Sequence, residues 1–152
     1  MYIKTEHEMA LIIEGGRILG GVLEKLAGMV QPGVSAWEID RKAEQFIRKA
    51  GGLPVFKGYK TQPGDTPFPC TVCISLNEEV VHGIASKDKI FSEGDLVSID
   101  IGMEYPKKSG EGRNVMDLSP TQRSRLVLAL FQKTKLNSSM LRARLYTKAY
   151  QR

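Results

Sequence analysis

Apolar residues recur at three- and four-residue steps from Glu6 to Val30, which is the spacing of one long amphipathic helix. Its apolar positions are Leu11, Ile12, Ile18, Leu19, Val22, Leu23, Leu26 and Val30. Glycines also lie inside this segment, at positions 15, 16, 20 and 21. Each disfavours a helix by about 1 kcal/mol relative to alanine. We therefore expect another element to approach that face closely.

A second helix is predicted after the break at "QPGV". Ser35 and Glu38 have the spacing of a capping box, and Val34 and Ile39 are placed to form a hydrophobic staple around it. The helix should end at Gly51, because glycine favours helix C-termini. The apolar stripe of this helix comprises Trp37, Ile39, Ala43, Phe46, Ile47 and Ala50.

The pattern changes at residues 57–69, a segment too rich in proline and glycine for regular structure and expected to be a loop. Loops of this length are uncommon unless they have a function. Beyond it, "TVCISL" and "LVSIDIGMEY" read as β-strands, and "VVHGI" reads as a return strand or the end of one. Turns are expected at "NEE" and "SEGD". Two helices followed by a small antiparallel sheet predict an α+β domain.

The composition changes after Tyr105. Residues 1–106 carry 11 Lys or Arg against 15 Asp or Glu, a net charge of −4, whereas residues 107–152 carry 11 against 2, a net charge of +9. The second segment offers one apolar run, "LVLALF", and one weakly amphipathic basic stretch, "SMLRARLYTKAY". We therefore expect a domain at 3–105 and a basic tail at 106–152 that is poorly ordered or helical. Such a tail fits a nucleic-acid-binding arm or a stretch of different origin.

Cys70 and Cys73 form a single C-x-x-C motif. A structural zinc site needs two more ligands, yet the chain has no second motif of this kind and only two histidines, His7 and His82. A redox pair would open a helix, whereas "CTVCISL" is typical of a strand. The pattern favours two small, half-buried thiols on one strand.

The first residues and the longest apolar run bear on the cellular location of the chain. The first residues carry scattered charges and no apolar stretch, so a secretory signal is not supported. The longest apolar run, at 126–131, is too short to span a bilayer. We expect a cytoplasmic location and no membrane partner.

Two residues in the predicted sheet are candidates for chemistry. Alternation in "LVSIDIG" places Asp100 on the face opposite Val97, Ile99 and Ile101, and a carboxylate within a strand is costly unless it is paired, metal-bound or exposed. A solvent-facing Asp on a half-exposed sheet explains the position equally well. His82 lies between apolar residues and a glycine, where a hydrogen-bonded core histidine is the simpler interpretation.

Three motifs, taken together in their order and spacing, favour a chemical role for Asp100 and His82 over a structural one. "KGY" at 57–59, "CISLNEEVVHGI" at 73–84 and "EGDLVSIDIG" at 93–102 closely resemble the N-terminal half of type I methionine aminopeptidases. The helical opening segment resembles that family as well, and the resemblance covers residues 3–105. It implies the N-terminal half of a pita-bread (creatinase/aminopeptidase-like) fold, in which two αβ halves enclose a dinuclear metal site.

The resemblance also implies a function, which is metal-dependent hydrolytic removal of N-terminal methionine from nascent polypeptides. Two divalent ions (Co, Mn, Fe or Zn) would generate the nucleophile and stabilise the charge on oxygen. Asp100 matches the first metal-binding aspartate. His82 matches a substrate-facing histidine that hydrogen-bonds near the scissile amide. Tyr59, Phe68 and Cys73 fall where the family lines its methionine pocket. Partners would be nascent N-termini, with the ribosome as a further candidate.

The chain departs from the family after Tyr105. A second aspartate is expected in a segment resembling "GLYTDMA", and Asp117 in "VMDL" is the one candidate. A second half, with a histidine and two glutamates, is not found, and no histidine follows His82. Too few ligands remain for a dinuclear site. We therefore predict a truncated, inactive chain followed by a tail of different origin, as either a reading-frame shift or a truncation would leave. The missing half should leave an exposed apolar sheet face that favours self-association.

The alternative function is that of a non-catalytic pseudo-enzyme that binds RNA or the ribosome through its basic tail. The net charge of +9 in residues 107–152 motivates it. The small number of aromatic residues available for stacking in that segment argues against it.

Overall fold

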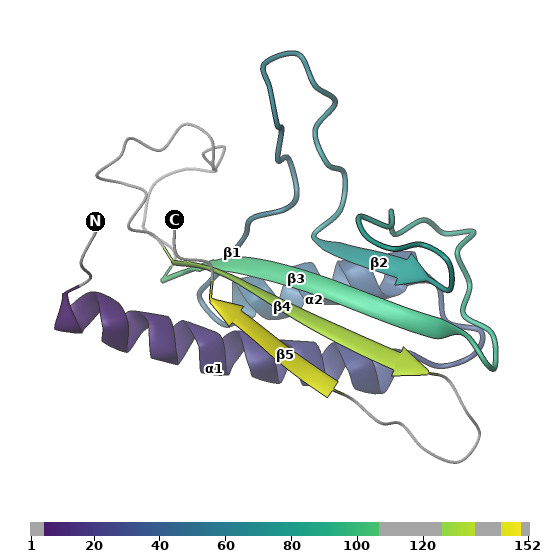
Figure 1. The fold of residues 1–152 in the computed structure, drawn as a ribbon, viewed down its shortest axis with the longest axis horizontal. Helices are drawn as coiled ribbons and strands as arrows, with labels where there is room; N and C mark the ends of the chain where they lie inside the picture. Colours follow the sequence, from purple (N-terminus) through teal and green to yellow (C-terminus); the bar gives the residue numbers. More distant parts are fainter. Residues whose placement is uncertain (1–4, 107–125, 136–143, 150–152) are drawn as a thin grey trace.

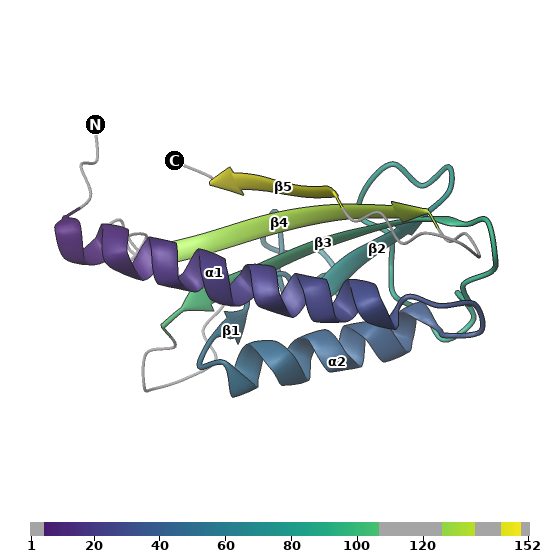
Figure 2. The same cartoon turned by 90° about the horizontal axis from the view of Figure 1, so that it is seen from below.

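A computed structural model describes residues 5–106, 126–135 and 144–149. Both helices lie on the same side of an antiparallel sheet (Figures 1 and 2). The elements are α1 (Glu6–Met29), α2 (Ala36–Lys49), β1 (Leu53–Pro54), β2 (Val72–Leu76), β3 (Leu96–Tyr105), β4 (Leu126–Lys135) and β5 (Arg144–Ala149). The strand order is β1-β3-β4-β5, and β2 also pairs with β3. The long strand β3 is therefore the centre of the sheet.

Both predicted helices are confirmed to within a residue or two, and local hydrogen bonds explain where they begin. Ser35 Oγ accepts from the Glu38 amide at 3.3 Å, and the Glu38 carboxylate accepts from the Ser35 amide at 2.9 Å. The first helix begins with the same device, formed by Thr5 and Glu8, which the sequence analysis did not single out. These reciprocal bonds satisfy amides that a helix start leaves without partners.

The core lies between the helices and β2 and β3. Val97, Ile99 and Ile101 are buried on the helix side, so the predicted alternation of β3 is confirmed. The fully buried apolar residues of the helices in the same core are Leu19, Leu23, Leu26, Ala36, Ile39, Ala43 and Ile47. The exposed large apolar residues of segment 5–106 lie on helices and loops. An exposed apolar sheet face was therefore a wrong expectation for β1 to β3, because alternation puts polar residues on the face away from the helices.

Trp37 is a correction to the predicted stripe of the second helix. Its side chain is 39% exposed, whereas Ile39 is fully buried. Two residues along a helix correspond to about 200°, so these side chains point in opposite directions. The Trp37 ring instead lies under two cations, with Lys87 Nζ at 5.0 Å and the Arg41 guanidinium at 5.9 Å from its centroid.

Gly21 of α1 bears on the expected close approach of another element. An added Cβ at Gly21 would meet nothing within 4 Å, so no close approach requires glycine there. The expectation was therefore wrong at this position.

The described parts of the tail are strands, so the expectation of poor order or helix is wrong for them. β4 pairs with the whole of β3, from Leu96 opposite Lys135 to Tyr105 opposite Leu126, and β5 pairs with β4. The physical reason is that β3 offers a free edge over its full length. A short apolar run such as "LVLALF" has no period of its own, so an available edge can decide its conformation.

Candidate functional site

β2 and β3 bring two predicted site residues together. Cys73 lies directly opposite Asp100 in the antiparallel register, and Ser75 lies opposite Ser98 on the same face. This face points away from the helices, because Ile74 and Ile99 occupy the other one. Cys73 and Ser75 are buried, whereas Asp100 is half-buried. Both strands therefore place polar groups on the side of the sheet that the helices leave open.

His82 belongs to a loop and not to the predicted return strand. Its backbone has φ of 59°, in the left-handed region, and it interrupts any extended conformation of "VVHGI". The next residue, Gly83, docks on the backbone of β2, where the Ile74 amide donates to the Gly83 carbonyl at 2.9 Å. The imidazole is exposed. The structure therefore groups Cys73 and Asp100 across the two strands and holds the loop that carries His82 on one of them, β2.

The electrostatics of this group follow from burial. Burial raises the pKa of Asp100, and the nearby His82 and the Ile101 amide partly oppose that rise. Burial raises the pKa of the Cys73 thiol to about 12, and the neighbouring Asp100 carboxylate adds to the effect. Cys73 is therefore a neutral thiol near pH 7, which suits an apolar contact and not a metal ligand.

The remaining predicted pocket residues form a separate pair at the base of the loop at 57–69. The Phe68 amide donates to the Tyr59 carbonyl and the Gly58 amide donates to the Phe68 carbonyl, both at 2.8 Å. These bonds tie the two ends of the loop together. The Tyr59 side chain is 42% exposed, whereas Phe68 packs partly against the core. The loop prediction is confirmed, and Tyr59 and Phe68 lie beside each other as its two stem residues.

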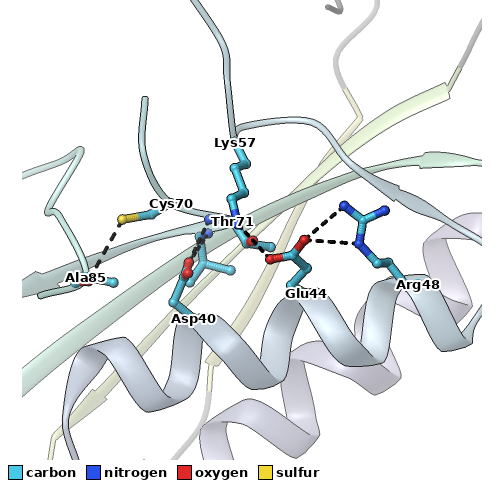
Figure 3. Close-up of polar contacts among 8 residues, drawn as sticks. Asp40, Glu44, Arg48, Lys57, Cys70, Thr71 and Ala85 are labelled. Carbon is cyan, nitrogen blue, oxygen red and sulfur yellow. Dashed lines mark hydrogen bonds and ion pairs between the residues drawn. The ribbon is translucent and has the colours of Figure 1, made fainter. Parts of the chain in front are cut away.

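Asp40 is a buried polar residue that the sequence analysis missed (Figure 3). Its side chain is 6% exposed, and its Oδ1 accepts from the amides of Thr71 at 2.6 Å and Val72 at 3.0 Å. Burial raises the pKa of Asp40, and these two amides partly oppose the rise. The sequence did contain a signal. Asp40 lies on the buried stripe of α2, four residues from both Ala36 and Glu44, where an unpaired carboxylate would be costly.

A surface ion-pair network lies next to Asp40 in Figure 3. The Glu44 carboxylate binds Lys57 Nζ at 2.8 Å and Arg48 at 2.9 Å, which links α2 to the first residue of the loop at 57–69. Cys70 Sγ lies 3.9 Å from the Ala85 carbonyl, which connects the start of β2 to the loop that carries His82. These contacts hold both loops against the ordered core.

The two cysteines are buried free thiols. Cys73 lies on β2, whereas Cys70 precedes this strand, so the prediction of two half-buried thiols on one strand is corrected in both respects. Burial raises the pKa of Cys70 as well as that of Cys73, which disfavours the thiolate that redox chemistry needs.

The donor side chains of the described residues do not form a metal site. Within the described ranges, no group of three or more His, Cys, Asp or Glu side chains could hold an ion. Asp117 lies outside the described residues. Asp100 and a neutral thiol do not fit a dinuclear centre, since such a centre needs several deprotonated ligands around both ions.

The sequence profile of metallopeptidase family M24 matches residues 10–121, which is more than half of the chain. The chain belongs to metallopeptidase family M24. Its relatives include the methionine aminopeptidase of Aquifex aeolicus, 40% identical over 107 residues that make up 70% of this chain and 42% of that protein. Methionine aminopeptidase 1 of Bacillus subtilis is 42% identical over 108 residues, or 71% of this chain and 41% of the relative.

A solved structure of a methionine aminopeptidase, from Thermotoga maritima, also resembles this M24 chain. The TM-score is 0.69 with 26% identity, covering 92% of this chain and 47% of the other. The predicted resemblance and the predicted fold, part of a pita-bread architecture, are confirmed. The chain spans about two fifths of the length of the curated relatives it matches. No described helix of this M24 chain is long and apolar enough to cross a membrane.

Proposed function

We propose that this M24 chain carries part of a site for removing N-terminal methionine from nascent polypeptides, and that the chain by itself is inactive. The observation that carries the proposal is the cross-strand pair of Cys73 and Asp100, with the loop that carries His82 docked on β2 through Gly83. The similarity to methionine aminopeptidases over residues that include these three positions supports it.

Each residue has a role in this proposal. His82, exposed on its loop, would donate a hydrogen bond near the scissile amide, where charge develops on oxygen. The neutral thiol of Cys73 and the rings of Tyr59 and Phe68 would contact the methionine side chain, because soft and aromatic surfaces suit a thioether. Asp100 would be the first carboxylate of the metal centre.

The proposed inactivity follows from the ligand count. Asp100 is one carboxylate, and a single further carboxylate from Asp117 would still leave a dinuclear centre incomplete. We therefore derive no hydrolytic step for the chain alone. The boundary near residue 105 and an out-of-frame origin of the tail remain predictions. Reading all three frames of the coding DNA beyond the Tyr105 codon tests them, since a "GLYTDMA"-like segment in another frame is the expected result.

Activity of the chain alone is tested with a Met-Gly-Met peptide and added Mn or Co. The expected result is no methionine release above the background of the metal in buffer. Metal-dependent release by the purified chain would show that it completes its own site, and would refute the proposed inactivity.

A chimera tests the positive half of the proposal. Residues 1–105 are fused to the part of the Aquifex aeolicus methionine aminopeptidase that follows its matched segment. We expect metal-dependent release of methionine, which Asp100→Asn abolishes and His82→Gln lowers by about a hundredfold or more. His7→Gln is the matched control, because His7 lies on the exposed face of α1. A folded chimera that releases no methionine with either metal would contradict the proposal.

The RNA-binding alternative remains a prediction, and the charge of +9 in residues 107–152 is its motivation. Binding to ribosomal RNA that weakens steeply as salt rises from about 50 to about 200 mM would support it. Phosphate contacts made by Lys and Arg are expected to weaken over that range. Binding that is insensitive to salt would count against it.

A further inference from the structure

His82 has a backbone conformation that few residues other than glycine adopt. Its φ of 59° lies in the left-handed region, which His, Asn and Asp enter more often than other side chains but still at a cost. Surrounding contacts must hold such a residue in place. The residues on either side of His82 supply such contacts.

The contact next to His82 is made by Gly83, which is buried. A Cβ at this position would overlap the Ile74 carbonyl oxygen and would lie 2.8 Å from Ser75 Cα, so the loop rests directly on the backbone of β2. The Ile74 amide donates to the Gly83 carbonyl at 2.9 Å. The Gly83 amide in turn donates to Ser75 Oγ at 3.2 Å, in a buried setting.

The loop is also held on the other side of His82. The Glu79 carboxylate accepts from the Leu76 amide at 2.8 Å and from Lys89 Nζ at 2.7 Å, and Lys89 Nζ also donates to the Ile74 carbonyl at 3.1 Å. These bonds anchor the loop before His82, whereas Gly83 anchors it immediately after. Ser75 supplies the side-chain acceptor of that second anchor, and its own side chain is 4% exposed.

We propose that Ser75 is a positioning residue for His82. By accepting from the Gly83 amide, Ser75 keeps the adjacent residue left-handed and fixes the start of its side chain relative to β2. This inference rests on the proposed function only in giving His82 a substrate-facing role. The anchoring itself is a property of the chain that needs no metal, substrate or second half.

Hydrogen exchange followed by NMR on the full 152-residue chain tests the inference. In Ser75→Ala, the Gly83 amide should exchange about five- to tenfold faster, which corresponds to losing one buried hydrogen bond. The Cα resonance of His82 should move away from its left-handed value at the same time. The Ile101 amide, in the centre of β3, should be unchanged.

Ser98→Ala is the matched control, because Ser98 lies directly opposite Ser75 on the same sheet face but is not the acceptor of the Gly83 amide. It should leave both Gly83 exchange and the His82 resonance unchanged. Ser75→Thr, which keeps the hydroxyl, should restore both. The chain has only two histidines, so His7 on α1 provides an internal reference for the His82 imidazole signal.

Three results would overturn the inference. One is a folded Ser75→Ala chain whose Gly83 amide exchanges within about twofold of the unmutated rate, since loss of a hydrogen bond exceeds that change. Another is an equal effect of Ser98→Ala. The third applies if Ser75→Ala does not fold, and it is measured on the unmutated chain. A Gly83 amide that exchanges as fast as an unprotected peptide would refute the hydrogen bond to Ser75, whereas slowed exchange of that amide would support it.

The outcomes for the two proposals are separable. Faster exchange of the Gly83 amide in Ser75→Ala, together with an inactive chimera, would refute the proposed function and leave the positioning role of Ser75 intact. An unchanged exchange rate of the Gly83 amide in Ser75→Ala, together with an active chimera, would refute the positioning role of Ser75 and leave the proposed function intact.

Discussion

Asp40 on α2 accepts a 2.6 Å hydrogen bond from the Thr71 amide at the start of β2, across 31 residues of sequence. The same Oδ1 atom accepts from the Val72 amide at 3.0 Å. One buried oxygen therefore satisfies two backbone donors and joins the helix layer to the strand that carries Cys73 and Ser75.

We predict that Asp40→Ala lowers the free energy of unfolding by about 2 kcal/mol or more, because two buried amides lose their acceptor. Asp40→Asn should be far milder, since its amide oxygen can take the place of Oδ1. Asp65→Ala is the control. Asp65 accepts from the Gln62 amide at 2.8 Å in an exposed loop, where water can replace it. Urea unfolding of the variants checks the order, and equal losses in the two Ala variants would contradict it.

The buried carboxyl also predicts a pH dependence. Burial raises the pKa of Asp40 in the folded state above its unfolded value, so the folded chain holds this proton more tightly. The corresponding stability is fully present below the unfolded pKa and is lost as pH rises through the raised folded pKa. Asp40→Asn should therefore gain stability relative to the unmutated chain as pH rises through the raised folded pKa of the Asp40 carboxyl. If the difference in stability between Asp40→Asn and the unmutated chain does not change with pH, this prediction is refuted.

Cys73 should react very slowly with thiol reagents. With a pKa of about 12, its thiolate fraction at pH 8 is about a thousandfold below that of an ordinary cysteine, and burial adds a barrier to access. Iodoacetamide labelling of Cys70→Ser measures Cys73 alone, and the same chain in guanidinium should react at the ordinary rate. Asp100→Asn should speed native labelling, because a negative neighbour is removed. An equal labelling rate with and without the Asp100 carboxylate would contradict its contribution to the raised pKa of Cys73.

Two glycines should respond oppositely to alanine. Gly21→Ala should stabilise the chain by up to about 1 kcal/mol, because the position is helical and nothing lies within 4 Å of the added Cβ. Gly83→Ala should destabilise it, because the new methyl group would overlap the Ile74 carbonyl. Thermal unfolding checks both signs. A lower melting temperature for Gly21→Ala would show that its face of α1 has no room for a side chain.

The sequence predicted the helices and the central strand well, because their signals are local. Ser35 and Glu38 are three residues apart and need no other part of the chain to form their capping box. Alternation in β3 likewise placed Val97 and Ile99 on the core side. The strand expected around His82 was wrong, since the apolar letters of "VVHGI" do not reveal that the backbone turns left-handed there.

The sequence by itself determined the two helices, the strands β2 and β3, and membership of a metallopeptidase family, because periodicity, caps and ordered motifs are written within short stretches. Only the tertiary structure decided which residues meet. Cys73 lies opposite Asp100 through strand register, Asp40 reaches Thr71 from another layer, and β4 pairs with the open edge of β3. These contacts depend on backbone groups tens of residues apart that must satisfy one another, and no local pattern records such a requirement.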